Sequence, residues 1–150
     1  MRKHAGRRYR FPGHWQFMNP IDLLVVDDNA AEALLVLCAL EDCPRPIHMH
    51  LAKDGSEALR MLSERTFDLV ILDLNLPGLS GFDVLKQCDP SREPVVVFSV
   101  SSNKADAERA VELGARELVT KPISLEPYKN AVLKMIEKWV LNAPGKSQTA

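Results

Sequence analysis

The sequence has few cysteines and no long apolar segment. Its 150 residues include only Cys38, Cys43 and Cys88, and their spacing matches neither a CxxC pair nor a metal site. We expect reduced, mostly buried thiols, with Cys43 the most exposed because Pro44 and Pro46 follow it in a loop. No apolar run approaches the roughly 18 residues of a membrane helix, and the N-terminus lacks the hydrophobic stretch of a secretion signal. The chain is therefore expected to be cytoplasmic.

Residues 1–20 contain no acidic side chain. This segment carries five basic residues, whereas the whole chain has a net charge of −1, which leaves −6 on the remainder. An acidic body argues against nucleic-acid binding by the main domain. We expect residues 1–20 to be a basic extension, either disordered or the product of an upstream start, since Met18 stands just before the first strand pattern.

Over the rest of the chain, five short apolar runs alternate with five segments of helical periodicity. Near-continuous apolar runs are typical of parallel strands that are covered on both faces. Right-handed crossovers would join them into one α/β domain at residues 21–142, a doubly wound five-stranded parallel sheet with five helices, followed by a tail at 143–150. The expected strands are 21–26, 47–51, 68–72, 95–99 and 117–120, and the expected helices are 30–40, 55–65, 81–87, 104–113 and 124–141.

Polar side chains stand at the ends of four of these strands. In doubly wound sheets, ligands bind beyond the carboxyl ends of the strands. Each residue alone has an ordinary structural explanation, such as a helix cap, a turn or a surface charge, but together they indicate a binding or catalytic site. They are Asp27 and Asp28 after the first strand, Asp73 after the third, Ser99 at the end of the fourth and Lys121 after the fifth.

Three carboxylates at one edge of a sheet repel one another, by about 3 to 4 kcal/mol per pair at about 4 to 5 Å and an effective dielectric constant near 20. Lys121 offsets part of this repulsion. A hard divalent ion such as Mg²⁺ suits a site made of carboxylate, carbonyl and water oxygens. A phosphoryl group would add a charge of about −1.5 to −2, which makes such a cation necessary.

Four motifs in this order resemble the receiver domain of response regulators in two-component signalling. The resemblance spans residues 21 to 140, and it rests on LLVVDDN (23–29), DLVILDLNLPGLSG (68–81), VVVFS (95–99) and LGARELVTKP (113–122). It implies a flavodoxin-like sheet with strand order 2-1-3-4-5. It also implies a single-domain response regulator, a phosphoprotein rather than an enzyme, which accepts a phosphoryl group on Asp73 from a histidine kinase and signals by conformational change or phosphorelay.

The same resemblance gives each residue of the site a role. Ser99 would donate its hydroxyl to the phosphoryl group, and Lys121 would pair first with Asp73 and then with that group. The Lys121–Pro122 bond would be cis. The implied Mg²⁺ ligands are Asp73, Asp28 directly, Asp27 through water and Asn75 through its backbone carbonyl.

Finer features are similar to the single-domain regulators that partner bacterial phytochromes, which implies a light-sensing kinase. These features are LNLPGLSG at 74–81, SVSSN at 99–103 and the tryptophan of IEKWV at 136–140. The last helix has a wide apolar stripe, which either belongs wholly to the core or also serves a partner. We expect a symmetric homodimer through helix 104–113, strand 117–120 and helix 124–141. Only residues 142–150 follow that helix, too few for a DNA-binding helix-turn-helix.

Two departures from related patterns matter. Leu118 stands three residues before Lys121, where most receivers carry an aromatic residue that moves on activation, so the switching mechanism stays open. A phosphatase of the haloacid-dehalogenase type would need a second acid two residues after its nucleophile, and the chain has Asn75 there. A degenerate receiver that serves only as a docking scaffold is the remaining alternative, and the intact acids and lysine argue against it.

Overall fold

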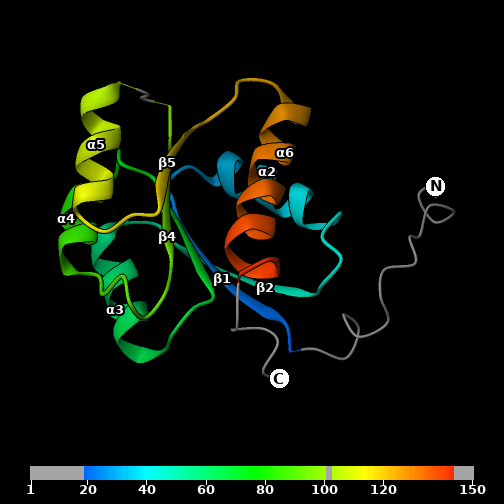
Figure 1. Cartoon of the computed structure of the whole chain (residues 1–150), viewed down its shortest axis with the longest axis horizontal. Helices are drawn as coiled ribbons and strands as arrows, with labels where there is room; N and C mark the ends of the chain where they lie inside the picture. The colour runs from blue at the N-terminus through cyan, green and yellow to red at the C-terminus, as the bar shows by residue number, and fades with distance from the viewer. Residues whose placement is uncertain (1–18, 101–102, 144–150) are drawn as a thin grey trace, which may run out of the picture.

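The computed structural model describes residues 19–100 and 103–143, which form one parallel sheet with helices on both faces (Figure 1). Nearly all of the predicted extension and residues 144–150 of the predicted tail lie outside the described residues. Within the described ranges, no helix is long and apolar enough to cross a membrane. The elements are, in order, β1 (Ile21–Val26), α2 (Ala30–Leu40), β2 (Ile47–Ala52), α3 (Gly55–Glu64), β3 (Leu69–Leu72), α4 (Gly81–Gln87), β4 (Val95–Ser99), α5 (Lys104–Glu112), β5 (Glu117–Thr120), α6 (Leu125–Ile136) and the π-helical turn η2 (Glu137–Leu141).

The strand order is β2-β1-β3-β4-β5, and every pairing is parallel, so the predicted topology is confirmed. The register pairs Val26 of β1 with Leu72 of β3. It therefore places the acids that follow these two strands beside each other. Backbone hydrogen bonds extend the ladder into the site, since Asp73 N–H donates to the Val26 carbonyl at 3.0 Å and Lys121 N–H donates to the Ser99 carbonyl at 2.8 Å.

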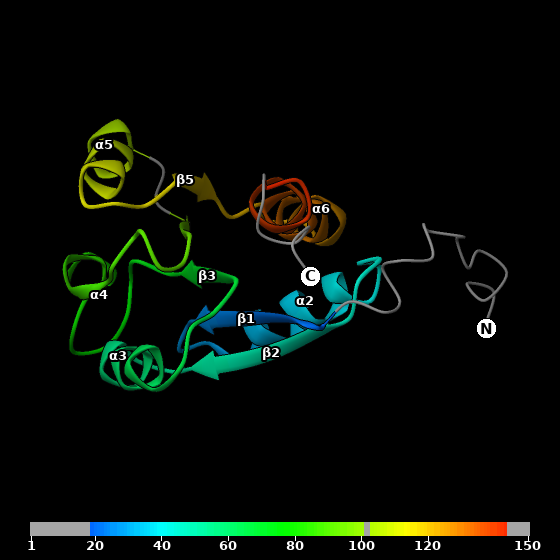
Figure 2. The ribbon, with the colours of Figure 1, turned by 60° about the horizontal axis from the view of Figure 1, so that its bottom comes forward.

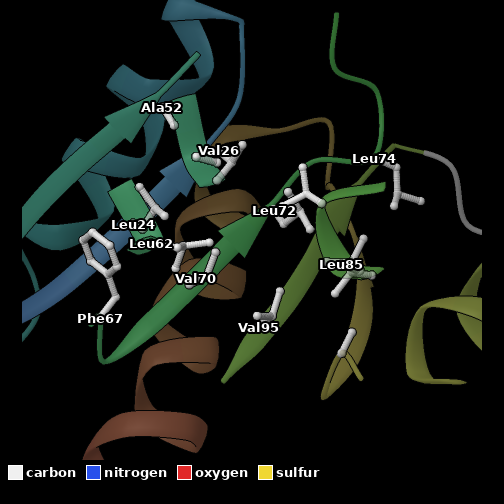
Figure 3. Close-up of a cluster of buried hydrophobic side chains, with 14 of the residues drawn as sticks. Leu24, Val26, Ala52, Leu62, Phe67, Val70, Leu72, Leu74, Leu85 and Val95 are labelled. Atoms are coloured by element: carbon white, nitrogen blue, oxygen red, sulfur yellow. The ribbon is translucent and has the colours of Figure 1, made fainter. Parts of the chain in front are cut away.

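The sheet separates two apolar layers, as Figure 2 shows. One layer packs α2 and α6 against one face of the sheet, and the other packs α3, α4 and α5 against the opposite face. Alternate side chains of a strand enter different layers: Leu24 and Val26 join the second (Figure 3), whereas Leu23 and Val25 join the first. Burial on both faces explains why the central strands are apolar without interruption.

Local signals fix the loops around the carboxyl ends of the strands. The Asn29 side chain caps α2 by accepting from the backbone N–H groups of Ala31 and Glu32, so α2 starts directly after the two acids. In the loop after β3, a Cβ atom at Gly81 would lie 2.5 Å from the Asp73 carbonyl oxygen. Only glycine fits this approach, which holds α4 against the end of β3.

The last helix differs from the prediction of one regular helix over 124–141. It is α-helical to Ile136 and then widens into η2, where Asn142 N–H donates to the Glu137 carbonyl at 2.8 Å. The Trp139 indole N–H donates to the Glu117 carboxylate at 2.8 Å, while Val140 is buried in the core. The stripe on α6 is mostly core, because Tyr128, Val132, Met135 and Ile136 are buried.

The prediction that Cys43 is the most exposed cysteine is wrong. Cys38 is exposed, because it lies on the outer face of α2, whereas Cys43 and Cys88 are partly buried. Burial raises the pKa of the Cys43 thiol, and it raises that of Cys88 to about 11.

A thiol reagent at pH 8 should therefore modify Cys38 first. With a pKa of about 11, only about one Cys88 side chain in a thousand is the reactive thiolate at that pH. Time-resolved labelling with an alkylating agent, followed by peptide mass spectrometry, measures the order. Labelling of Cys88 before Cys38 would contradict the burial of these side chains.

Candidate functional site

Three carboxylates meet at the carboxyl edge of the sheet. Ligand atoms of Asp27, Asp28 and Asp73 all lie within 4.8 Å of one another. Asp27 and Asp73 are buried, whereas Asp28 is exposed. The sequence prediction that these acids gather at one edge agrees with the register of β1 and β3.

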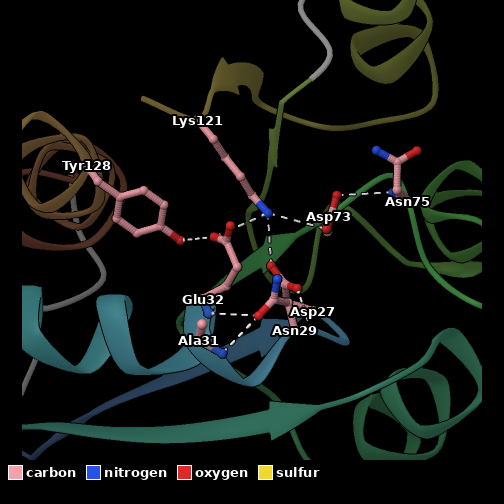
Figure 4. Close-up of polar contacts among 8 residues, drawn as sticks. All are labelled: Asp27, Asn29, Ala31, Glu32, Asp73, Asn75, Lys121 and Tyr128. Carbon is pink, nitrogen blue, oxygen red and sulfur yellow. Dashed lines mark hydrogen bonds and ion pairs between the residues drawn. The ribbon is translucent and has the colours of Figure 1, made fainter. Parts of the chain in front are cut away.

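The Lys121 amine lies among the acids of this edge (Figure 4). Lys121 Nζ is 2.9 Å from Asp27 Oδ2, 3.3 Å from Asp73 Oδ2 and 3.4 Å from Glu32 Oε1. The Lys121 side chain is only 6% exposed. Solvent therefore screens its charge little, and this charge acts strongly on the carboxylates of Asp27, Asp73 and Glu32.

The electrostatics of the pocket favour a charged amine and penalise a charged Asp73. Burial raises the pKa of the Asp73 carboxyl, although the Asn75 backbone N–H and the Lys121 charge lower it, and Asp27 raises it further. For Lys121, burial lowers the pKa, but the hydrogen bond to Asp27 and the charges of Asp73, Asp27 and Glu32 outweigh this, so the pKa lies above its ordinary value. A further cation in the pocket would stabilise the ionised form of Asp73.

Asn75 and Ser99 complete the predicted set. The Asn75 backbone N–H donates to Asp73 Oδ1 at 3.0 Å, which leaves Oδ2 to Lys121. Ser99 is fully buried at the end of β4. The prediction of a cis Lys121–Pro122 bond is wrong, because no peptide bond among the described residues is cis. The long lysine side chain reaches the acids from a trans backbone.

The donor set fits a divalent metal. The three acids supply closely spaced carboxylate oxygens, the ligand type that hard cations such as Mg²⁺ prefer. Asp27 and Asp73 each have one oxygen on a backbone N–H and the other on Lys121, and the Asp27 contact to Lys121 is the shorter, at 2.9 Å against 3.3 Å. Asp28 is exposed, and it is the acid best placed to bind an ion from solvent.

Sequence reasoning missed two residues of the site, Glu32 and Tyr128. The Glu32 carboxylate contacts Lys121, and the Tyr128 hydroxyl donates a hydrogen bond to Glu32 Oε1. A signal for Glu32 existed, since an acid in the first turn of a helix that starts beside the site lies near it. Tyr128 lies in the apolar stripe of the last helix, where a buried tyrosine hydroxyl usually needs a polar partner.

Comparison with known proteins assigns the family. The family model described as the response regulator receiver domain matches residues 23–133. This range includes all but the first two residues of β1, the whole of the other four strands and most of α6, and it contains all the residues of the pocket. The chain therefore belongs to the response regulator receiver family, in agreement with the resemblance of its motifs.

Among curated proteins, the chain is 33% identical over 132 residues to the probable methanogenesis regulatory protein FilR2 of Methanothrix harundinacea, covering 81% of this chain and 85% of FilR2. It is 36% identical over 106 residues to protein-glutamate methylesterase/protein-glutamine glutaminase 3 of Geobacter sulfurreducens, covering 70% of this chain but only 29% of that protein. The match to the methylesterase is thus confined to a minor part of its length.

Two solved structures of response regulators are similar to this chain. The phosphorylated cyanobacterial phytochrome response regulator RcpA has a TM-score of 0.76 and 30% identity, with 85% of this chain and 98% of that chain covered. The Mn²⁺-bound form of response regulator Rcp1 has a TM-score of 0.74 and 28% identity, with 82% and 96% covered. One of these similar response regulators is phosphorylated and the other has a divalent metal bound.

Proposed function

We propose that the chain is a phosphoacceptor of a two-component system, in which Asp73 takes a phosphoryl group and the domain signals by conformational change or by passing the group on. The observation that carries the proposal is the position of Asp73, whose carboxylate contacts the buried Lys121 amine and lies within 4.8 Å of two other carboxylates. In this proposal the chain has no enzymatic turnover on an external substrate.

In this reaction one Asp73 oxygen forms a bond to phosphorus as the P–N bond of a phosphohistidine breaks and the imidazole keeps the electron pair. Lys121 is positioned to neutralise the charge that the phosphoryl oxygens bring. The buried Ser99 hydroxyl would donate to one of those oxygens. The Asn75 N–H holds Asp73 Oδ1 and so fixes the orientation of the carboxylate.

The proposed cofactor is Mg²⁺, held by the carboxylates of Asp28 and Asp73, by the Asn75 backbone carbonyl and, through water, by Asp27. When bound, Mg²⁺ would supply positive charge beside the phosphoryl oxygens. The support lies in the exposed Asp28 beside two buried acids; burial raises the pKa of Asp73, and a cation beside it would favour its ionised form.

Incubation with acetyl phosphate and Mg²⁺ tests the proposal. The intact mass should increase by that of one phosphoryl group, and the adduct should map to the peptide that contains Asp73. Chelation of the metal with EDTA should suppress the labelling. An adduct on a different residue, or no adduct with metal present, would refute the proposed function.

The proposed donor is a cytoplasmic sensor histidine kinase, and the likeness to the phytochrome response regulator RcpA favours a phytochrome kinase. In one neighbour of 27% identity and TM-score 0.68, the receiver domain of Ssk1 is seen with the histidine phosphotransfer protein Ypd1 of Saccharomyces cerevisiae. On this chain, Leu34 and Leu37 are exposed on α2, the helix that begins just after Asp28. An apolar helix face beside the acids suits a partner that must deliver its phosphohistidine to Asp73.

We also propose a symmetric homodimer through α5, β5 and α6. β5 is an edge strand, and exposed apolar side chains lie on α5 (Val111) and at the start of α6 (Leu125). Sedimentation equilibrium at roughly tens of micromolar should therefore report a dimer, and Val111→Asp should shift it to monomer. The matched control is Leu34→Asp on α2, which should stay dimeric. A parent protein that sediments only as a monomer would contradict this interface.

A further inference from the structure

A continuous series of polar contacts leads from Asp73 to α6 (Figure 4). Lys121 Nζ bridges the carboxylates of Asp73 and Glu32, at 3.3 Å and 3.4 Å. The Tyr128 hydroxyl then donates to the Glu32 oxygen that faces Lys121. The contacts thus join the ends of β3 and β5 to the first turn of α2 and the first turn of α6.

The outer end of this series is fixed by packing. Tyr128 is 3% exposed, and its ring lies against Phe98 with the centroids 5.1 Å apart. Phe98 directly precedes Ser99 at the end of β4, so the tyrosine is held between α6 and the strand that carries a site residue. Burial and the Glu32 carboxylate raise the Tyr128 pKa, so the hydroxyl keeps its proton and remains a donor.

The donors of Lys121 are shared among three carboxylates, so a stronger pull from one side weakens a contact on another. An ammonium group has three donors, and three carboxylates already surround it. A phosphoryl group on Asp73 would replace the single negative charge of that carboxylate by about −1.5 to −2 charges, carried on the phosphoryl oxygens. Of the present contacts, the one to Glu32 is the longest, and Glu32 is also the most exposed of the three acids. Glu32 is therefore the partner that Lys121 gives up most readily.

We propose that Glu32 is a positioning residue for Lys121 and that, when a phosphoryl group on Asp73 draws Lys121 away, Glu32 and Tyr128 transmit the change to α6. The inference rests on the proposed function, since Asp73 must first be phosphorylated. It gives the domain a route from the phosphorylation site to a helix that needs no aromatic side chain on β5.

Hydrogen exchange of the α6 peptide, with and without acetyl phosphate and Mg²⁺, tests the route. In the parent, phosphorylation should change the exchange rate of amides in the first turns of α6 by about fivefold, the factor that corresponds to one hydrogen bond worth about 1 kcal/mol. Tyr128→Phe keeps the ring but removes the donor, and Glu32→Ala removes the acceptor, so both should lose this response. Glu32→Gln retains an oxygen that accepts from Tyr128 and Lys121, and it should restore the response.

The control is Glu117→Gln, which alters a different polar contact of the C-terminal helix, the one to Trp139, and should respond as the parent does. Intact mass measures the phosphorylated fraction of every sample. If the parent forms no adduct, the proposed function fails and this inference falls with it. If the proteins are phosphorylated but Tyr128→Phe responds like the parent, or α6 of the parent does not respond, this inference alone is overturned.

Discussion

Asp73→Asn should reduce the rate of phosphorylation by acetyl phosphate and Mg²⁺ by a factor of about 1000 or more, which corresponds to about 4 kcal/mol in activation free energy. An amide has the shape of the carboxylate but is a far poorer nucleophile, and the remaining acids are differently placed. Asp27 is held closer to Lys121 than Asp73 is, at 2.9 Å against 3.3 Å, and Asp28 is exposed rather than buried. The measurement is the intact mass of the protein over time.

The matched control is Asp89→Asn. Asp89 is an acid outside the pocket, where its carboxylate accepts hydrogen bonds from Ser91. This variant should be labelled at the rate of the parent. If Asp73→Asn acquired the label as readily as the parent, the phosphoacceptor would have to be a different residue.

Lys121→Met should lower the free energy of unfolding by about 3 to 5 kcal/mol in metal-free buffer. Methionine is similar in length to lysine but carries no charge, so Asp27 and Asp73 would stay buried without their amine. Urea denaturation in the presence of EDTA measures the loss. The matched control is Lys104→Met on α5, whose side chain is 88% exposed, and it should change the stability by less than about 1 kcal/mol.

The loss of unfolding free energy caused by Lys121→Met should also depend on pH. Loss of the amine removes one of the influences that lower the Asp73 pKa, so this already raised pKa rises further. A carboxyl group whose pKa is raised in the folded state destabilises the fold at pH values above the ordinary aspartate pKa. At lower pH the group is protonated in both states and has no effect. The loss of unfolding free energy should therefore be largest near neutral pH and shrink as the pH falls through the carboxyl range. Equal stability of both proteins at neutral pH would contradict the role given to Lys121.

The secondary structure was predictable because each element has a local signal. β1, α2, α4, β4 and β5 have the predicted bounds, and the strand order follows the family resemblance. The predictions for the last helix and for Cys38 were wrong because contacts outside the element decide these features. The last helix widens into η2 where Trp139 binds Glu117 of β5, and Cys38 is exposed because α2 turns its outer face away from the sheet.

The candidate site was predictable only in part. The strand ends placed Asp27, Asp28, Asp73, Ser99 and Lys121 at one edge, since parallel strands present their carboxyl ends together. Neither Glu32 nor Tyr128 stands at a strand end. Their contact depends on how two helices, separated by most of the chain, pack on the same face of the sheet.

The sequence by itself determined the alternation of strands and helices, the family and the edge at which the charged residues gather, because periodicity and turn residues act over a few neighbouring positions. The tertiary structure decided which acids share the Lys121 amine and that Tyr128 of α6 reaches Glu32 of α2. The physical reason is that such contacts depend on differences of an ångström in the packing of distant elements. Hydrophobic patterning selects the buried face of a helix, but it does not set the position of the helix along the sheet.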